Sequence, residues 1–370
     1  MEIGVSIAMK SRLVLPSMNF WNNFLIHSLL SETTNEEFNT IIFDDFLNNP
    51  LFKGRNIHTY HAVYSKKKQI IIDSSRLLKL NNDNSCFDEI YVSISAPNLK
   101  IYNLLASIFT FKKVYFLEES LFSYVRFLVD KNLVNLVNQH QLYLVNYNEA
   151  ILEAVFKAGV NPQNVVFFKK QDLLNNMLPL QVATKAQAVV LIDSIKENNP
   201  NKDFIINEYK SYIKLLVAQN KSVCLRPHIK LAKSIYENLS EFIKPYENVS
   251  LEYGKSGVET LALQQDTVVL SSYSTALLSL KFLYDAQIWT SYKLLQKRIS
   301  FFQFNYMALS SRVIIYLFPD FVGEIKKGRL PNSLTDYVLG KKYSPRWLMN
   351  MFVFWYSRVL LERLHYKVKL

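Results

Sequence analysis

One stretch decides the fold of this chain: residues 89–120 have the sequence EIYVSISAPNLKIYNLLASIFTFKKVYFLEES. It begins and ends with short β-branched and aromatic runs, which predict strands at Glu89–Ser93 and Lys113–Leu117. The longer segment between them predicts a helix. A strand, a helix and a second strand in this order are typical of a parallel α/β unit.

The same alternation extends along the chain in both directions. Besides the two strands above, we expect strands at Arg12–Leu15, Thr40–Phe43, Gln69–Ile72, Ala188–Ile192, Ser222–Leu225, Thr267–Leu270 and Gln287–Thr290. The segment Leu173–Lys185 lacks strand character and is predicted to be a linker with a helical turn. The strands therefore form two series, which predict Rossmann-like lobes over 1–172 and 186–295, followed by an extension over 296–370.

The composition fits two globular lobes. The chain has 370 residues, of which 49% are hydrophobic and 20% charged, so it is too long for one ordinary core and shows no sign of disorder. Cys86 and Cys224 lack the spacing of a zinc site or a disulfide framework, which suits a reducing compartment. No signal peptide and no run of roughly eighteen uncharged apolar residues is recognisable. We therefore expect a cytoplasmic protein.

The residues that directly follow each strand are the candidates for a site, because ligands of open parallel sheets bind beyond the carboxyl ends of the strands. None of the expected strands leads into a GxGxxG or P-loop sequence, and the chain has only eight glycines. These features disfavour a dinucleotide-dependent dehydrogenase and a P-loop ATPase.

Two adjacent carboxylates, Glu118 and Glu119, follow the strand Lys113–Leu117. Neighbouring like charges raise the pKa of one member of such a pair, which favours a general base. Carboxylates are also stabilising at the start of a helix, so a purely structural role stays open.

A basic group follows the strand Ser222–Leu225. Pro227 cannot donate a hydrogen bond to a sheet, so the strand should end there and leave His228 at its edge. Arg226 and His228 would supply two donors suited to phosphate oxygens, although a single histidine is more often structural.

A third group of polar residues lies between the strand Thr267–Leu270 and an apolar helix expected at Ala276–Leu283. Hydroxyl side chains in this position cap a helix, and the free N–H groups at a helix start also bind anions. The two roles are compatible. The residues concerned are Ser271, Ser272, Ser274 and Thr275.

The order of the three groups resembles that of bacterial sialyltransferases of the GT-B type. It is most similar to the lipooligosaccharide sialyltransferases of glycosyltransferase family 52 and the related capsule polysialyltransferases of family 38. Those families share an acidic-acidic-Gly motif, a His-Pro motif and a Ser-Ser motif. Here Ser120 stands in place of the glycine, and Ile229 stands where a proline follows the family's histidine. The resemblance covers roughly residues 12–295.

The resemblance implies a GT-B fold, two Rossmann-like lobes facing a cleft, and an inverting transfer of sialic acid from CMP-sialic acid. Glu118 would deprotonate the acceptor hydroxyl with Glu119 in support, and His228 would stabilise the departing CMP phosphate. Arg226 and the hydroxyl group cluster Ser271, Ser272, Ser274 and Thr275 would hold the donor. CMP has one phosphate and no DxD sequence follows a strand, so we expect no metal and no cofactor.

The tail is the most basic part of the chain, whose net charge is +12. Residues 341–370 contain seven basic residues and one acidic residue. Ser344-Pro345 is a good helix start, and Trp347–Leu364 is predicted to be an aromatic, basic helix. Such a helix can pack on the first lobe or lie in a membrane interface, where a lipid-linked acceptor would be found. We expect peripheral attachment to the inner face of the cytoplasmic membrane.

Two other functions remain open at the level of sequence. One is a polysialyltransferase, because basic clusters such as Lys66-Lys67-Lys68 can hold a polyanionic chain. The other is a non-catalytic membrane adaptor that reuses the fold. Nucleic-acid binding is not expected, because the charge is concentrated in the tail rather than on one lobe face. Neither the acceptor nor the choice between sialic acid and another CMP-activated acid sugar, such as Kdo, follows from the sequence.

Overall fold

A computed structural model shows that the chain divides into two compact units. Unit 1 comprises Met1–Leu173 and Trp355–Leu370, and unit 2 comprises Leu174–Phe354. The structure describes residues 10–16, 19–32, 38–44, 51, 57–64, 69–72, 86–119, 123–124, 126–127, 130–147, 149–199, 202–228, 231–252, 257–271, 274–290 and 367–369.

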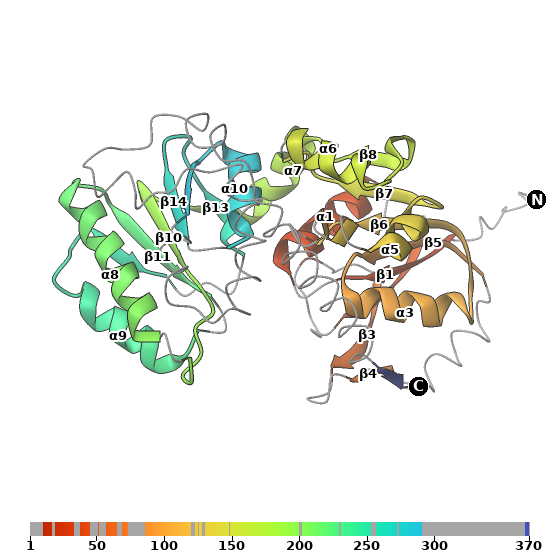
Figure 1. Cartoon of the computed structure of the whole chain (residues 1–370), viewed down its shortest axis with the longest axis horizontal. Helices are drawn as coiled ribbons and strands as arrows, with labels where there is room; N and C mark the ends of the chain where they lie inside the picture. Colours follow the sequence, from red (N-terminus) through yellow and green to blue (C-terminus); the bar gives the residue numbers. More distant parts are fainter. Residues whose placement is uncertain are drawn as a thin grey trace, which may run out of the picture. The chain divides into compact units, whose positions relative to one another are not determined.

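Unit 1 contains one large sheet with the strand order β16-β4-β3-β2-β1-β5-β6-β7-β8 (Figure 1). All neighbouring strands are parallel except β3 and β4. The strands are β1 (Lys10–Leu15), β2 (Phe38–Asp44), β3 (Ile57–Tyr64), β4 (Gln69–Ile72), β5 (Cys86–Ser93), β6 (Thr110–Leu117), β7 (Gln141–Leu144), β8 (Val165–Phe167) and β16 (Lys367–Lys369). The helices among its described residues are α1 (Phe20–Glu32), α3 (Ala96–Ala106), α5 (Lys131–Val137) and α6 (Glu149–Lys157), and α7 (Lys170–Met177) crosses the boundary to unit 2.

The strand order of unit 1 reverses between β1 and β5, which makes this pair the topological switch point of a doubly wound sheet. Helix α3 begins there because Ser95 caps it: the Ser95 hydroxyl accepts a hydrogen bond from the Asn98 N–H. The Asn98 side chain in turn donates to the carbonyls of Leu15, at 3.0 Å, and Pro16, at 2.8 Å. The start of α3 thus holds the carboxyl end of β1 in place.

Unit 2 is a smaller doubly wound unit with the strand order β12-β11-β10-β14-β15, all parallel. Its switch point lies between β10 and β14. The strands of this sheet are β10 (Ala188–Ile192), β11 (Val223–Pro227), β12 (Val249–Leu251), β14 (Val268–Ser271) and β15 (Gln287–Thr290). A separate two-stranded pair joins β9 (Val182–Ala183) to β13 (Leu261–Ala262), and the helices are α8 (Lys202–Ala218), α9 (Lys233–Ile243) and α10 (Ala276–Tyr284).

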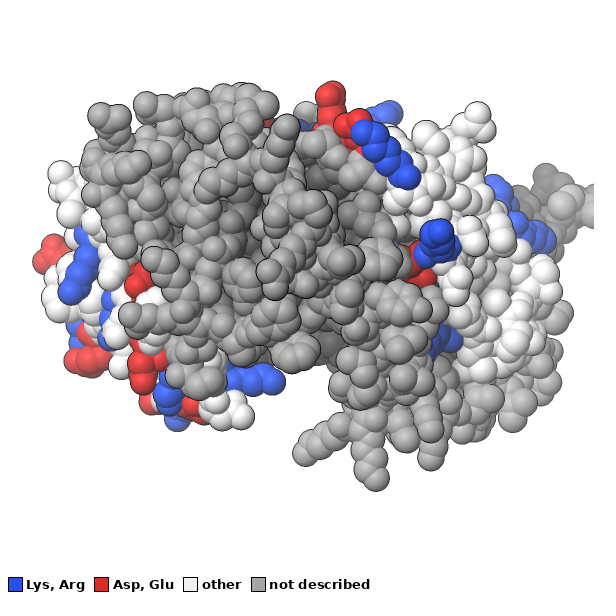
Figure 2. Space-filling view, viewed as in Figure 1, with Lys and Arg blue, Asp and Glu red and all other residues white. Residues whose placement is uncertain are grey.

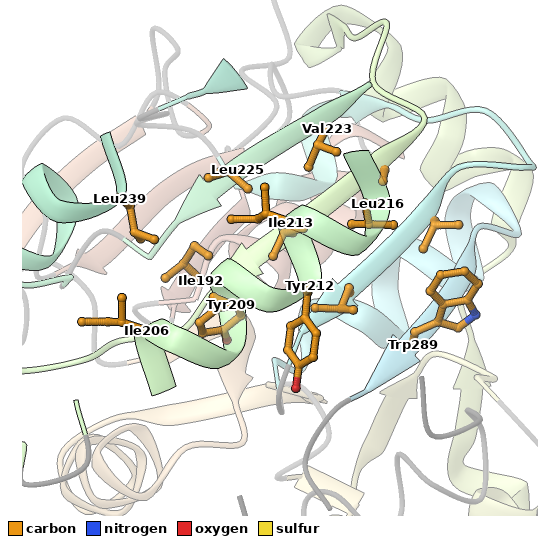
Figure 3. Close-up of a cluster of buried hydrophobic side chains, with 14 of the residues drawn as sticks. Ile192, Ile206, Tyr209, Tyr212, Ile213, Leu216, Val223, Leu225, Leu239 and Trp289 are labelled. Atoms are coloured by element: carbon orange, nitrogen blue, oxygen red, sulfur yellow. The ribbon is translucent and has the colours of Figure 1, made fainter. Parts of the chain in front are cut away.

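The core of unit 2 explains why its strands can be recognised in the sequence. Every residue of β10 is buried, as expected for a central parallel strand with both faces covered. Alternate residues of β10, β11 and β14 pack against the apolar sides of α8 and α9, as Figure 3 shows. Helix α10 packs against β14 and β15. The sheet is thereby held rigid up to its carboxyl edge.

Each of the nine strands expected from the sequence has an observed counterpart. The structure adds β3, β7, β8, β12 and β16 to these sheets. Helix α7 and the short turn Leu178–Leu180 occupy much of the segment expected to be a linker. The aromatic helix expected at Trp347–Leu364 lies outside the described residues, but Lys367–Lys369, further along the same extension, forms β16 and pairs with β4.

Candidate functional site

The acidic pair lies immediately beyond the carboxyl end of β6, where the sequence predicts it. All four backbone polar groups of Glu118 and Glu119 have partners. The N–H groups donate to the Tyr143 carbonyl at 3.2 Å and to the Ser123 hydroxyl at 2.6 Å. The carbonyls accept hydrogen bonds from the side-chain amides of Asn22 and Asn19. The pair is therefore fixed in place by residues from three other parts of unit 1.

The Glu118 side chain is completely buried, with 0% exposure. Its carboxylate accepts hydrogen bonds from three side chains. Tyr147 Oη donates to Oε1 at 2.6 Å, Trp21 Nε1 lies 3.3 Å from the same oxygen, and the Tyr124 hydroxyl donates to Oε2. The Val145 N–H lies 3.4 Å from Oε2. We call this group, Glu118 with Trp21, Tyr124 and Tyr147, the acid cluster.

Burial raises the pKa of Glu118 to about 7, because the charged form is deprived of water. The hydrogen bonds from Tyr124, Tyr147, Val145 and Trp21 act in the opposite direction but do not cancel this effect. A carboxyl group with such a pKa exchanges a proton readily near neutral pH. Glu119 differs, because it is only half-buried. The role of Glu118 as a base stays a prediction.

Two buried polar side chains of unit 2 lie at the switch point between β10 and β14. Asp193 directly follows β10 and is 7% exposed. Its carboxylate accepts hydrogen bonds from the Tyr209 hydroxyl and, at 3.2 Å, from Ser271 Oγ. Ser271 is the last residue of β14, so the two side chains bridge the point where the strand order reverses. This is where doubly wound sheets bind their ligands.

The hydroxyl group cluster expected from the sequence lies between β14 and α10, and part of it is outside the described residues. Ser271 is fully buried, and its Oγ accepts a hydrogen bond from the Ser274 N–H at 3.3 Å. Ser274 Oγ lies 3.4 Å from the N–H of Ala276, at the start of α10. Thr275 makes no side-chain cap, and Ser272 lies outside the described residues. The Ser271 hydroxyl thus links the Asp193 carboxylate to the backbone of Ser274.

Strand β11 ends at Pro227, as predicted, and His228 is exposed beside it. The His228 N–H donates to the Ile192 carbonyl at 2.9 Å, which anchors His228 to the end of β10. Arg226 forms an ion pair within the unit: its guanidinium lies 3.5 Å from the Glu252 carboxylate. His228, Asp193 and Ser271 therefore lie at the same edge of the sheet, whereas Arg226 has an acidic neighbour.

Sequence reasoning missed the partners of these residues. Trp21 and Tyr147 belong to the acid cluster, but they are 97 and 29 positions from Glu118, so no local pattern joins them. Asp193 could have been noticed, because it follows an apolar strand directly, as Glu118 does. Glu259 is a further buried carboxylate, and Ser279 Oγ donates to it at 2.8 Å. It does not directly follow a predicted strand, so the sequence gives no local indication of it.

Among the described residues, no group of three or more His, Cys, Asp or Glu side chains is arranged to hold a metal ion. Within the same residues, no helix combines the length and the apolar character that crossing a bilayer requires.

Fold and site together define the class of the protein. It is an α/β protein of two successive Rossmann-like units, the organisation of the GT-B class, with polar side chains at the carboxyl edge of each sheet. The predicted α/β class with two Rossmann-like lobes is confirmed. Its C-terminal helical part lies outside the described residues.

Comparison with known proteins gives structural neighbours only. No protein-family model matches the sequence, and no curated protein sequence matches it significantly. A UDP-GlcNAc 2-epimerase from Methanocaldococcus jannaschii is 11% identical, with 76% of this chain and 84% of that chain covered and a TM-score of 0.47. The heptosyltransferase WaaC of Escherichia coli is 13% identical, with coverage of 76% and 88% and a TM-score of 0.43. A Photobacterium 2,6-sialyltransferase bound to CMP and lactose is 8% identical, with coverage of 76% and 71% and a TM-score of 0.47.

Proposed function

We propose that the protein is a glycosyltransferase that uses a nucleotide-activated sugar, and that its donor is CMP-sialic acid. The acceptor hydroxyl of a lipooligosaccharide or capsular glycan would attack the anomeric carbon of the donor sugar. The bond from that carbon to the phosphate oxygen breaks, and CMP leaves with the electron pair. The hydroxyl proton passes to Glu118, so the anomeric centre is inverted in one displacement.

The observation that carries this proposal is the acid cluster. Burying a carboxylate is costly because its charged form loses water, and strongly perturbed carboxyl groups at the ligand-binding edge of a sheet are frequently catalytic. Burial raises the pKa of Glu118 to about 7, which suits a base that works near neutral pH. A non-catalytic adaptor has no need of such a group.

Unit 2 supplies features suited to the donor. The N–H groups at the start of α10 have acceptors nearby: those of Ala276 and Leu277 contact Ser274, and that of Leu278 donates to the Thr275 carbonyl. This helix start can attract phosphate oxygens through the helix dipole, and the exposed His228 lies at the same edge of the sheet. Asp193 has both carboxylate oxygens hydrogen-bonded, which fits a role in holding Ser271 rather than in meeting a ligand.

The experiment that tests the proposal is a screen of CMP-sialic acid, CMP-Kdo and UDP-sugars with lactose as acceptor, read by product mass. We expect transfer from CMP-sialic acid, with slow CMP release when the acceptor is omitted. We also expect the rate to be unchanged in excess EDTA, because the proposed mechanism uses a base and a phosphate site and no metal. Transfer from a UDP-sugar alone would contradict the donor assignment, and loss of activity restored by magnesium would contradict the metal-free mechanism.

Replacing His228 by alanine is expected to raise the KM for the CMP-sugar and to lower kcat. A hydrogen-bond donor beside the phosphate stabilises the bound CMP-sugar in the ground state. It stabilises the transition state more strongly, because negative charge develops there on the leaving group. The KM for lactose should change little. Arg226→Ala should weaken donor binding with less effect on kcat, because the Arg226 guanidinium is shared with Glu252. Unchanged donor kinetics in His228→Ala would remove this histidine from the site.

A polysialyltransferase is the second function within the same class. On the face shown in Figure 2, basic side chains of unit 2 lie among acidic ones. Three of its ion pairs, Lys202–Glu197, Lys233–Glu237 and Lys244–Glu241, show this mixing. A surface of mixed sign does not favour a polyanionic chain, so we propose single transfer. We also propose that the basic tail binds the cytoplasmic face of the membrane, although its helix lies outside the described residues.

A further inference from the structure

The acid cluster poses a problem for the proposed function, on which this inference rests. A base must reach the proton that it removes, but the Glu118 side chain is 0% exposed. Its carboxylate is surrounded by Trp21, Tyr124, Tyr147 and the Val145 N–H. An acceptor hydroxyl therefore needs an intermediary to transfer its proton to this carboxylate.

The three side chains that donate to Glu118 differ in their access to solvent. Trp21 and Tyr124 are each 2% exposed, whereas Tyr147 is half-buried. Tyr147 also lies beyond the end of β7, the strand next to β6, so it shares the carboxyl edge of the sheet with the acidic pair. Of these donors, Tyr147 is the one that can contact a ligand at that edge.

The hydrogen bonds of Tyr147 have the direction that proton transfer requires. Tyr147 Oη donates to Glu118 Oε1 at 2.6 Å, and Trp21 Nε1 donates to Tyr147 Oη at 2.7 Å. If Tyr147 passes its proton to Glu118, the indole N–H stabilises the charge that develops on the phenol oxygen. That oxygen can then take the proton of a hydroxyl beside it.

We propose that Tyr147 is a catalytic residue that relays the acceptor proton to the buried Glu118. In one concerted step the acceptor O–H proton moves to Tyr147 Oη, and the Tyr147 proton moves to Glu118 Oε1. The acceptor oxygen forms its bond to the anomeric carbon as the bond to the phosphate breaks. Tyr147 ends the step neutral, Glu118 ends it protonated, and proton loss from Glu118 to solvent by the reverse route resets the site.

Tyr124 is the matched control. It also donates to the Glu118 carboxylate, and its hydroxyl lies 2.6 Å from the Val145 carbonyl. Burial, and then the charge of Glu118, raises the pKa of Tyr124 well above its ordinary value, so it remains a fixed donor. A purely structural network would make removal of the Tyr124 hydroxyl at least as harmful to turnover as removal of the Tyr147 hydroxyl. A relay predicts the opposite order.

The experiment compares the full-length wild type, Tyr147→Phe and Tyr124→Phe, with CMP-sialic acid and lactose as substrates. We expect Tyr147→Phe to lose roughly 10²-fold in kcat, with the KM for CMP-sialic acid changed by less than about twofold. Tyr124→Phe should unfold at the lower temperature of the two variants and lose less than about tenfold in kcat. Trp21→Phe, which removes the N–H that supports the relay, should lose about tenfold in kcat even if Tyr147→Phe does not fold.

The possible outcomes separate the two proposals. An active wild type whose kcat survives Tyr147→Phe, or falls further in Tyr124→Phe, overturns the relay and leaves the proposed function intact. Normal turnover by Trp21→Phe also counts against the relay. A wild type that neither transfers sialic acid nor releases CMP contradicts the proposed function itself, and the relay with it.

Discussion

The kcat of the Glu118→Gln variant is expected to fall by about 10² to 10⁴, the usual contribution of general base catalysis. Glutamine is nearly isosteric with glutamate and still offers an oxygen to one side of the acid cluster. It has no site for the proton that the acceptor must lose. The fold and the KM for the CMP-sugar should therefore be preserved, and the loss should appear in kcat. Steady-state kinetics with each substrate varied in turn measures both constants.

Glu119→Gln is the control for this prediction, because it makes the same chemical change at the neighbouring position. Glu119 is half-buried and its backbone is held by Asn19 and Ser123, so its replacement should leave the acid cluster in place. We expect a smaller loss of kcat. If Glu119→Gln abolishes transfer and Glu118→Gln does not, the half-buried member of the pair, Glu119, is the base.

The second large effect concerns stability and does not depend on any substrate. The pKa of Glu118 rises from 4.5 in the unfolded chain to about 7 in the folded one. Between these values the folded state keeps a proton that the unfolded state has lost, so raising the pH favours unfolding. The contribution of Glu118 to the free energy of unfolding should fall by about 3 kcal/mol between pH 4.5 and 7, and then level off. Glu118→Gln should remove this component.

Hydrogen exchange measures the effect within unit 1. The Val145 N–H donates to both Glu118 and Tyr124, so peptides spanning 141–147 report on the acid cluster. After correction for the intrinsic rate, their protection should decline from pH 5 to 7 in the wild type and in Glu119→Gln, but not in Glu118→Gln. Peptides from β10 in unit 2 serve as the reference. Parallel pH dependence in all three proteins would show that Glu118 is not the group responsible.

The limits of sequence-based prediction can be seen in particular residues. The strand Ala188–Ile192 is predictable because a strand covered on both faces is apolar throughout. Strand β8 is missed because its three residues are too few to display a period, and β7 is missed because its sequence, QLYL, contains no β-branched residue. Strand β3 is missed because its sequence, IHTYHAVY, mixes histidines with apolar residues.

The site is predictable to a similar extent. Glu118, His228 and Ser271 are found because each occurs at or beside the end of a strand, which is a local property. Tyr147 and Trp21 are not found, because their contact with Glu118 depends on which strands become neighbours in the sheet. The burial that perturbs Glu118 likewise comes from tertiary packing. Sequence therefore locates the sheet edge that carries the candidate site and misses the side chains that contact Glu118 there.

The pairing of β16 with β4 has a consequence for how the chain is made. Residues 367–369 complete the edge of a sheet whose other strands lie within residues 10–167. The ribosome must therefore synthesise all of unit 2 before that edge can be closed. During this interval β4 presents unpaired backbone groups, which are a template for association with another chain. Folding during translation would accordingly finish in unit 2 first, and a nascent chain stalled before residue 367 would be prone to aggregation.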